Sequence, residues 1–153
     1  MKMLIAGEWV EGNSTIDVEN PYDGSVIDTV PDGTPEDIDR AIAAAEEGAR
    51  INRHLAVHER IAILKRTAVI VEEKSEEFAR TIATEGSKTI REARKEVARA
   101  VQTITISGEE ARRIAGETIP FDSMPGSENR VGYYFRFPIG IIGAVTPFND
   151  PLN

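Results

Sequence analysis

The sequence predicts an α/β fold in which short strands come before and after a block of helices along the chain. Near the N-terminus, short apolar segments alternate with turns that contain glycine, proline and asparagine, a pattern typical of hairpins. Residues 34–116 place apolar side chains every three or four positions, which indicates helices. Residues 139–144 form a continuous apolar run, which indicates a buried strand.

Two strand pairs are predicted ahead of the helices. Residues 4–11 form two short strands around Gly7. Residues 16–18 and 25–30 form the second pair, and the segment Asn20-Pro21-Tyr22-Asp23-Gly24 between them favours a turn.

The first predicted helix begins after Thr34. Threonine is a favourable cap, Pro35 suits the first helical position, and the acids Glu36 and Asp37 complement the positive end of the helix dipole. A second helix begins near Val57. The apolar stripes of these two helices comprise Ile38, Ala41, Ile42, Ala45 and Ala49 in the first, and Ile61, Leu64, Ala68 and Val71 in the second.

Two further helices complete the block. A short one runs from Ser75 to a stop at Gly86, and a long one covers about residues 89–115 and ends at Gly116. The stripe of the long helix is made mostly of small residues, which predicts close packing: Ala93, Val97, Ala100, Ile104, Ala111 and Ala115.

A hairpin with an aromatic face is predicted at residues 117–137. The loop 122–129 contains Pro125-Gly126 and separates two extended segments. In the second segment, alternation places four apolar side chains on one face: Val131, Tyr133, Phe135 and Phe137. That face is either half-buried core or a subunit contact, because an uncovered apolar edge favours aggregation.

The composition excludes several functions. The chain carries 18 basic and 26 acidic residues, and its net charge of -8 disfavours nucleic-acid binding. The absence of cysteine excludes disulfides, thiolate metal sites and a cysteine nucleophile within these residues. His54 and His58 are spaced to share a helical face, but no third metal ligand lies nearby, and a surface loop and a first helical turn are the favoured positions. No apolar stretch has the length of a signal peptide or a membrane span, so we expect a soluble, cytoplasmic protein.

A polar side chain follows the last predicted strand. Residues 139–144 lead into Val145-Thr146-Pro147-Phe148-Asn149, which places the Asn149 amide at the carboxyl end of a strand, where open α/β sheets bind ligands. The alternative is an ordinary asparagine that ends a strand. Because the sequence stops at Asn153, we expect it to be the front part of an enzyme.

Taken in order, these segments resemble the aldehyde dehydrogenase superfamily. Within it, the sequence is most similar to the group of archaeal lactaldehyde dehydrogenases and non-phosphorylating glyceraldehyde-3-phosphate dehydrogenases. The segments that carry the resemblance are Ile5–Val10, Asn20–Gly24, Glu85–Lys88 with Glu92-Ala93 and Glu96-Val97, Gly116–Pro120, Pro138–Gly143 and Thr146–Asn149.

The resemblance implies a chemistry and roles for particular residues. Enzymes of this family use NAD or NADP to oxidise a small aldehyde to its acid through a cysteine thioester. Asn149 matches the amide that stabilises the oxyanion, and Val145, Thr146, Pro147 and Phe148 match residues on the nicotinamide side of the cofactor pocket. Arg99 matches an arginine that contacts substrate phosphate in the glyceraldehyde-3-phosphate branch; the alternative is a solvated side chain. For Glu85 and Lys88 we expect only that they bracket a helix end.

The resemblance also implies a division of the chain. Residues 1–116 correspond to the N-terminal part of the cofactor-binding domain and residues 117–137 to an oligomerisation hairpin, which joins copies of the protein through Val131–Phe137. Residues 138–153 correspond to the first strand of a parallel sheet whose other strands are missing.

Departures from the family limit what these residues can do. Asp150 stands where an aromatic or apolar residue is usual, and no cysteine nucleophile, glutamate base or glycine-rich cofactor loop is present. Gly140 and Gly143 lie inside a predicted strand and so do not form a dinucleotide fingerprint. Two functions stay open: part of an aldehyde dehydrogenase that is inactive alone, or a non-catalytic interaction module that uses the face at residues 131–137.

Overall fold

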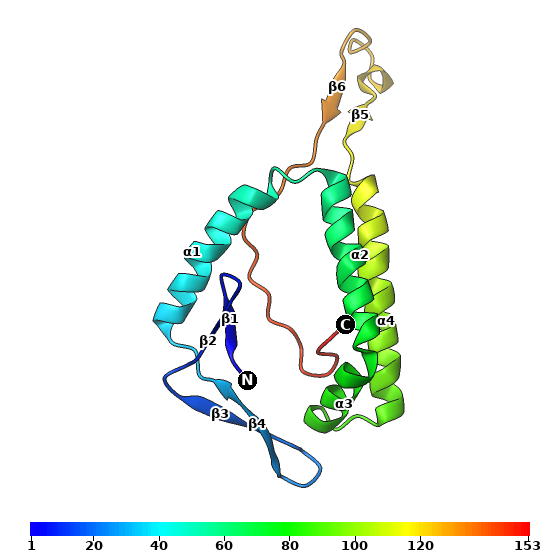
Figure 1. The fold of residues 1–153 in the computed structure, drawn as a ribbon. Coiled ribbons are helices and arrows are strands. Elements are labelled where there is room, and N and C mark those ends of the chain that lie inside the picture. The colour runs from blue at the N-terminus through cyan, green and yellow to red at the C-terminus, as the bar shows by residue number, and fades with distance from the viewer.

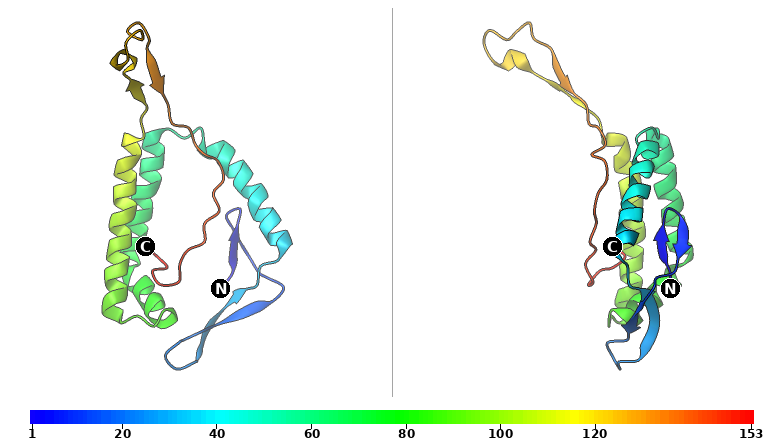
Figure 2. Two further views of the ribbon diagram at one scale, coloured as in Figure 1. Left: turned by 180° about the vertical axis from the view of Figure 1, so that it is seen from behind. Right: turned by 90° about the vertical axis from the view of Figure 1, so that its left-hand side faces the viewer.

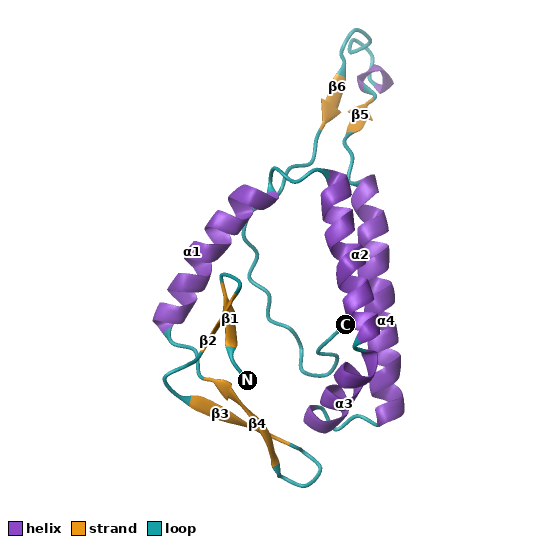
Figure 3. Ribbon diagram, viewed as in Figure 1, coloured by secondary structure: helices purple, strands orange, loops and turns teal.

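The computed structural model describes all residues from 1 to 153 and has the predicted α/β composition (Figure 3). Its elements are β1 Met3–Ile5, β2 Glu8–Val10, β3 Thr15–Glu19, β4 Val26–Pro31, α1 Pro35–Asn52, α2 Val57–Glu73, α3 Ser75–Glu85, α4 Ile90–Glu110, the 3-10 turn η1 Ala111–Arg113, β5 Glu117–Ile119, the 3-10 turn η2 Phe121–Ser123, and β6 Gly132–Tyr134.

The elements form an open frame around the C-terminal segment (Figures 1 and 2). Helices α2 and α4 lie side by side as a column, with α3 across one end of it. Helix α1 stands apart from this column, near the strands β1 to β4, and the β5–β6 hairpin projects beyond the helices. The segment after β6 runs back between α1 and the column, so its last residues reach α4.

The strands pair only as three separate antiparallel hairpins, β1–β2, β3–β4 and β5–β6. The first closes through Ala6 and Gly7, whose φ angles of 54° and 83° are those of a two-residue hairpin turn with both central residues left-handed. The second contains a register shift between Val18 and Glu19. Both N-terminal strand pairs are therefore confirmed.

Helix α1 begins as the sequence predicts. The Asp37 amide donates to Thr34 Oγ1 at 3.2 Å, and the Thr34 amide donates to Asp37 Oδ2 at 3.1 Å, with Pro35 in the first turn. Its apolar stripe is only partly covered, however, and no residue of α1 is buried. Ile38 and Ile42 are 59% and 48% exposed.

The core lies where α2, α3 and α4 meet. Its buried residues are Val71, Ala79, Ile82, Ala93 and Val97. The small side chains let the helices approach closely, as the stripe of α4 predicts. Gly108 of α4 lies against Leu64 of α2, because a Cβ on Gly108 would stand 3.5 Å from Leu64 Cβ.

Two boundaries differ from the prediction. Helix α4 ends at Glu110 and continues only as the short 3-10 turn, so Ala115 lies outside the helix. Gly116 does not end the helix; it lies where β5 approaches β6, and a Cβ there would come within 1.7 Å of the Tyr134 carbonyl oxygen. The glycine therefore permits the hairpin to begin.

The buried strand predicted at residues 139–144 is absent. These residues have no regular structure, and Ile139 and Ile142 are 88% and 74% exposed. A strand needs neighbouring backbone groups to satisfy its own, and no strand of the chain lies beside this segment. For the same reason the alternating segment forms a strand only over β6, where β5 pairs with it, and not through Phe137.

Candidate functional site

Five of the predicted site residues, Val145 to Asn149, lie in the irregular segment after β6, and the sixth, Arg99, lies on α4. Val145 and Phe148 are 99% and 92% exposed, and Asn149 is also exposed. The chain bends at residues 148–151 and then packs on the helices. Residues 145–148 are thus open to solvent on the irregular segment.

Asp150 attaches this bend to the helices through ion pairs with two cations. Arg99 Nη2 donates to Asp150 Oδ2 at 2.9 Å, and Lys88 Nζ donates to Asp150 Oδ1. Lys88 also bonds Glu96 Oε2 at 2.5 Å. The Glu96 side chain is only 2% exposed, so its charge is compensated by Lys88 inside the structure.

Local geometry fixes the position of Lys88. Helix α3 ends before Gly86, and Ser87, in the connection to α4, adopts a left-handed φ of 52°. Helix α4 begins directly afterwards, with Thr89 and Glu92 forming a reciprocal capping box. Lys88 is therefore held between two helix ends.

Three more contacts fasten the last residues to α4. The Leu152 amide donates to Glu96 Oε1 at 3.0 Å, and its side chain packs against the core. Thr103 Oγ1 donates to Asn153 Oδ1 at 2.8 Å.

The contacts favour the charged forms of Asp150 and Lys88. The bond from Lys88, with a further contribution from Arg99, lowers the pKa of the Asp150 carboxyl below its ordinary value. The bonds to Asp150 and Glu96 raise the pKa of Lys88 above its ordinary value.

The sequence predicted the positions of some of these residues but not the ion pairs that they form. Arg99 does come close to the segment that carries Asn149, but its guanidinium is bound to Asp150. Glu85 ends α3 and Lys88 directly precedes the cap of α4, so the two residues bracket the helix ends as expected. The ion pairs of Lys88 with Glu96 and Asp150 were not predicted. The available signal was Glu96, a carboxylate inside an apolar stripe, which requires a cation nearby.

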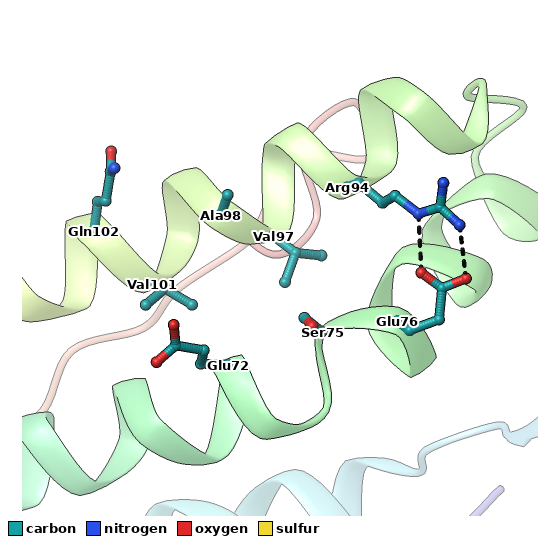
Figure 4. Close-up of a pocket in the computed structure, with 8 residues that line it drawn as sticks. All are labelled: Glu72, Ser75, Glu76, Arg94, Val97, Ala98, Val101 and Gln102. Carbon is teal, nitrogen blue, oxygen red and sulfur yellow. Dashed lines mark hydrogen bonds and ion pairs between the residues drawn. The ribbon is translucent and has the colours of Figure 1, made fainter.

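Two cavities border α3, and the Asn149 side chain lines neither of them. One of about 450 Å³ lies between α2, α3 and α4, and there Arg94 makes two 2.9 Å bonds to Glu76 (Figure 4). Another of about 390 Å³ lies between α3 and the bend, with Phe148 in its wall.

No cluster of three or more potential metal ligands exists. His54 lies in the turn after α1 and His58 in the first turn of α2, as predicted. No helix has the length and apolarity needed to cross a membrane.

Comparison with known proteins places this arrangement in a family. The aldehyde dehydrogenase family model matches residues 9–153. An aldehyde-dehydrogenase-like protein of Sinorhizobium fredii is 51% identical over 138 residues, which are 90% of this chain and 27% of that protein. Aspartate-semialdehyde dehydrogenase 1 of Pseudomonas canavaninivorans is 44% identical, over 90% of this chain and 29% of its own length. Lactaldehyde dehydrogenase of Methanocaldococcus jannaschii is 36% identical, over 99% of this chain and 31% of its own length.

A solved structure agrees. The NADP-dependent glyceraldehyde-3-phosphate dehydrogenase from Bacillus halodurans, complexed with NADP, matches with a TM-score of 0.92 and 31% identity. The match covers 99% of this chain and 33% of that one. The chain thus spans about a third of the length of the relatives it matches. With the family model matched over nearly all its residues, the chain belongs to the aldehyde dehydrogenase family.

Proposed function

We propose that this chain supplies the oxyanion donor of an NAD(P)-dependent aldehyde dehydrogenase that oxidises a small hydroxy- or phospho-aldehyde. The observation that supports this most is the exposed Asn149 amide on a bend that Asp150 and Leu152 fasten to α4. Addition of a thiolate to the aldehyde carbon places negative charge on the carbonyl oxygen. The Asn149 amide would donate a hydrogen bond to that oxygen, and a donor already in place stabilises it most.

We assign the residues ahead of Asn149 to the cofactor. Val145, Thr146, Pro147 and Phe148 form an exposed wall of apolar and hydroxyl groups, which fits one side of a nicotinamide ring. NAD or NADP, once bound, accepts hydride from the substrate carbon. The chain's own contribution is to orient that ring and to keep water from one of its faces.

Arg99 is our candidate for the substrate's polar end. One guanidinium nitrogen binds Asp150, and the side chain is 53% exposed, which leaves other donors free. The cavity beside it is lined by three cations and three anions: Lys88, Lys95, Arg99, Glu92, Glu96 and Asp150. The relatives are named for aspartate semialdehyde, lactaldehyde and glyceraldehyde-3-phosphate, so both charged and neutral small aldehydes fit this assignment.

The oxyanion role predicts a large effect of Asn149→Ala. In an enzyme that joins this sequence to a downstream catalytic cysteine, we expect the chemical step to slow by roughly a hundred- to a thousandfold. Cofactor affinity should change little, because the proposed partner of the amide is the substrate oxygen and not the cofactor. Single-turnover hydride transfer measures the step, with Asn129→Ala in the hairpin loop as the control. Transfer within a few-fold of the unsubstituted enzyme would show that Asn149 is only structural.

The second candidate is a non-catalytic interaction module. It is favoured by the exposed aromatic side chains around β6, where Tyr133 and Phe135 are 65% and 66% exposed. The same residues would join copies of a catalytic oligomer, so exposure alone does not separate the two functions. The coding sequence after codon 153 distinguishes the two functions. A downstream family cysteine supports the enzyme, and a stop codon supports the interaction module.

A further inference from the structure

Asp150 connects two parts of the chain that are far apart in sequence. Its two carboxylate oxygens take different partners, Lys88 from the α3–α4 connection and Arg99 from α4. A carboxylate held by two cations from separate elements has little freedom to shift. Asp150 is therefore fixed relative to the core helices.

A second attachment follows after one intervening residue. The Leu152 amide binds the buried Glu96, which also binds Lys88, so both attachments share one hydrogen-bonded network. The residue between them is Pro151, whose ring restricts the backbone. The backbone on the C-terminal side of Asn149 is thus held at two points.

Asn149 itself makes no hydrogen bond through its side chain, and it is exposed. Its amide can be held in place only through its neighbours in the chain. Phe148, on its other side, is 92% exposed and gives little support. The attachment therefore comes from Asp150.

We propose that Asp150 is a positioning residue. Through its ion pairs with Lys88 and Arg99, it determines the position of the Asn149 amide relative to α4. The functional meaning rests on the oxyanion role proposed above. The positioning itself is a property of this chain and is measured without activity.

The absence of cysteine makes a distance measurement simple. Nitroxide labels on Asn149→Cys and on Gln102→Cys, an exposed position of α4, report the distance from the bend to the helix by pulsed electron paramagnetic resonance. The parent pair should give one narrow distribution. Asp150→Asn keeps the shape but removes the charge, and we expect the width of the distribution roughly to double as the bend detaches. Asp150→Glu should restore most of the narrowness.

Matched variants test the two partners. Arg99→Gln, at a half-exposed position, should broaden the distribution in the same direction as Asp150→Asn. Asp122→Asn, in the hairpin, should leave it unchanged. Circular dichroism checks that helix content is kept in each variant. If Asp150→Asn unfolds the helices, Arg99→Gln decides the question.

The proposal is overturned if the distance distribution of Asp150→Asn is as narrow as that of the parent pair. If Asp150→Asn unfolds, the same result in Arg99→Gln overturns it. So does broadening that Asp150→Glu fails to reduce, because loss of the charge would then not be the cause. An Asn149→Ala enzyme of normal rate would remove the oxyanion role and leave this result standing.

Discussion

A buried carboxylate organises the residues around the candidate site. Glu96 occupies a position on the inner stripe of α4 between Ala93 and Ala100, where an apolar residue would otherwise pack. Lys88 and the Leu152 amide both bind it, so its burial leaves no unpaired charge or lone polar group. Removing Lys88 alone would leave that carboxylate without its cation, a larger disturbance than the loss of a surface pair.

The ion pairs predict how docking of residues 148–153 depends on pH. Because Lys88, and then Arg99, lower the pKa of Asp150, its stabilisation is present above the ordinary value of 3.8 and is lost as pH falls through the lowered pKa. The raised pKa of Lys88 gives a contribution that is present below 10.5 and is lost at higher pH. We expect constant docking between about pH 5 and pH 9.

A carbon-13 titration of the Asp150 carboxyl measures the acid side. Its midpoint should lie below 3.8, and Lys88→Met should move it upward. Arg99, Glu96, Glu92 and Lys95 of α4 also face this group and remain in both proteins. A midpoint at or above 3.8 in the unsubstituted chain would contradict the ion pair.

Single residues also show what the sequence could and could not predict. The cap at Thr34 and the stop at Gly86 depend on neighbours within a turn, and both were predictable. The contact between Arg99 and Asp150 spans 51 positions, and no local pattern encodes it. In the sequence, Asp150 stands out only as a departure from the family, whereas its ion pairs depend on which cations the fold brings to it.

At the scale of elements, helices and strands differ in how much they depend on the rest of the molecule. Helices α1 to α4 satisfy their backbone internally, and their caps and stripes predicted them with errors of a few residues. Residues 139–144 have the composition of a buried strand but no partner, so they remain irregular. An apolar composition shows that a segment is suited to a buried sheet. The segment forms a strand only where neighbouring strands are present to pair with it.

The β5–β6 hairpin gives an element-scale prediction. Gly116→Ala should open the hairpin, because the new Cβ would meet the Tyr134 carbonyl oxygen at 1.7 Å. Overpacking of this kind costs about 1–3 kcal/mol, which corresponds to a roughly five- to 150-fold gain in amide exchange at residues 117–119 and 132–134. Exchange followed by mass spectrometry measures it.

Gly48→Ala in α1 is the matched control. A Cβ at Gly48 meets nothing within 4 Å, so alanine should stabilise the helix by about 1 kcal/mol and leave the hairpin unchanged. Unaltered exchange in the hairpin of Gly116→Ala would mean that the strands can separate there without cost.

The whole molecule exposes far more surface than its mass predicts. Its accessible surface is 11899 Å². A compact protein of 16.8 kDa exposes about 7,700 Å². This chain therefore exposes roughly 4,200 Å² more than a compact protein of the same mass. Much of it is apolar, on α1, around β6 and along residues 139–148. These are also the segments in which the predicted apolar faces have no covering partner.

The absence of cysteine gives a prediction for the purified chain. We expect no NAD- or NADP-linked oxidation of lactaldehyde, glycolaldehyde or glyceraldehyde-3-phosphate by these 153 residues, because the chain lacks the thiolate that would attack the aldehyde. Absorbance of the reduced cofactor at high protein concentration tests this. Turnover above the rate of a heat-denatured sample would require a different nucleophile.

The uncovered apolar surface predicts self-association. Tyr133 and Phe135 stack edge to face at 5.5 Å on the projecting hairpin, and Val131 and Phe137 beside them are 88% and 83% exposed. Water disfavours such a surface, and the open edges of β5 and β6 can pair with another copy. Light scattering should therefore show an average mass that rises with concentration.

Two lysine substitutions locate the contact. Phe135→Lys places a charge on the aromatic face and should lower the average mass toward that of a monomer. Tyr22→Lys replaces an aromatic side chain that is 90% exposed in the β3–β4 turn, and it should leave the average mass unchanged. If both variants lower it equally, association comes from general stickiness and not from the hairpin. If the unsubstituted chain stays monomeric at high concentration, the exposed face is tolerated in water and Val131–Phe137 is not a subunit contact.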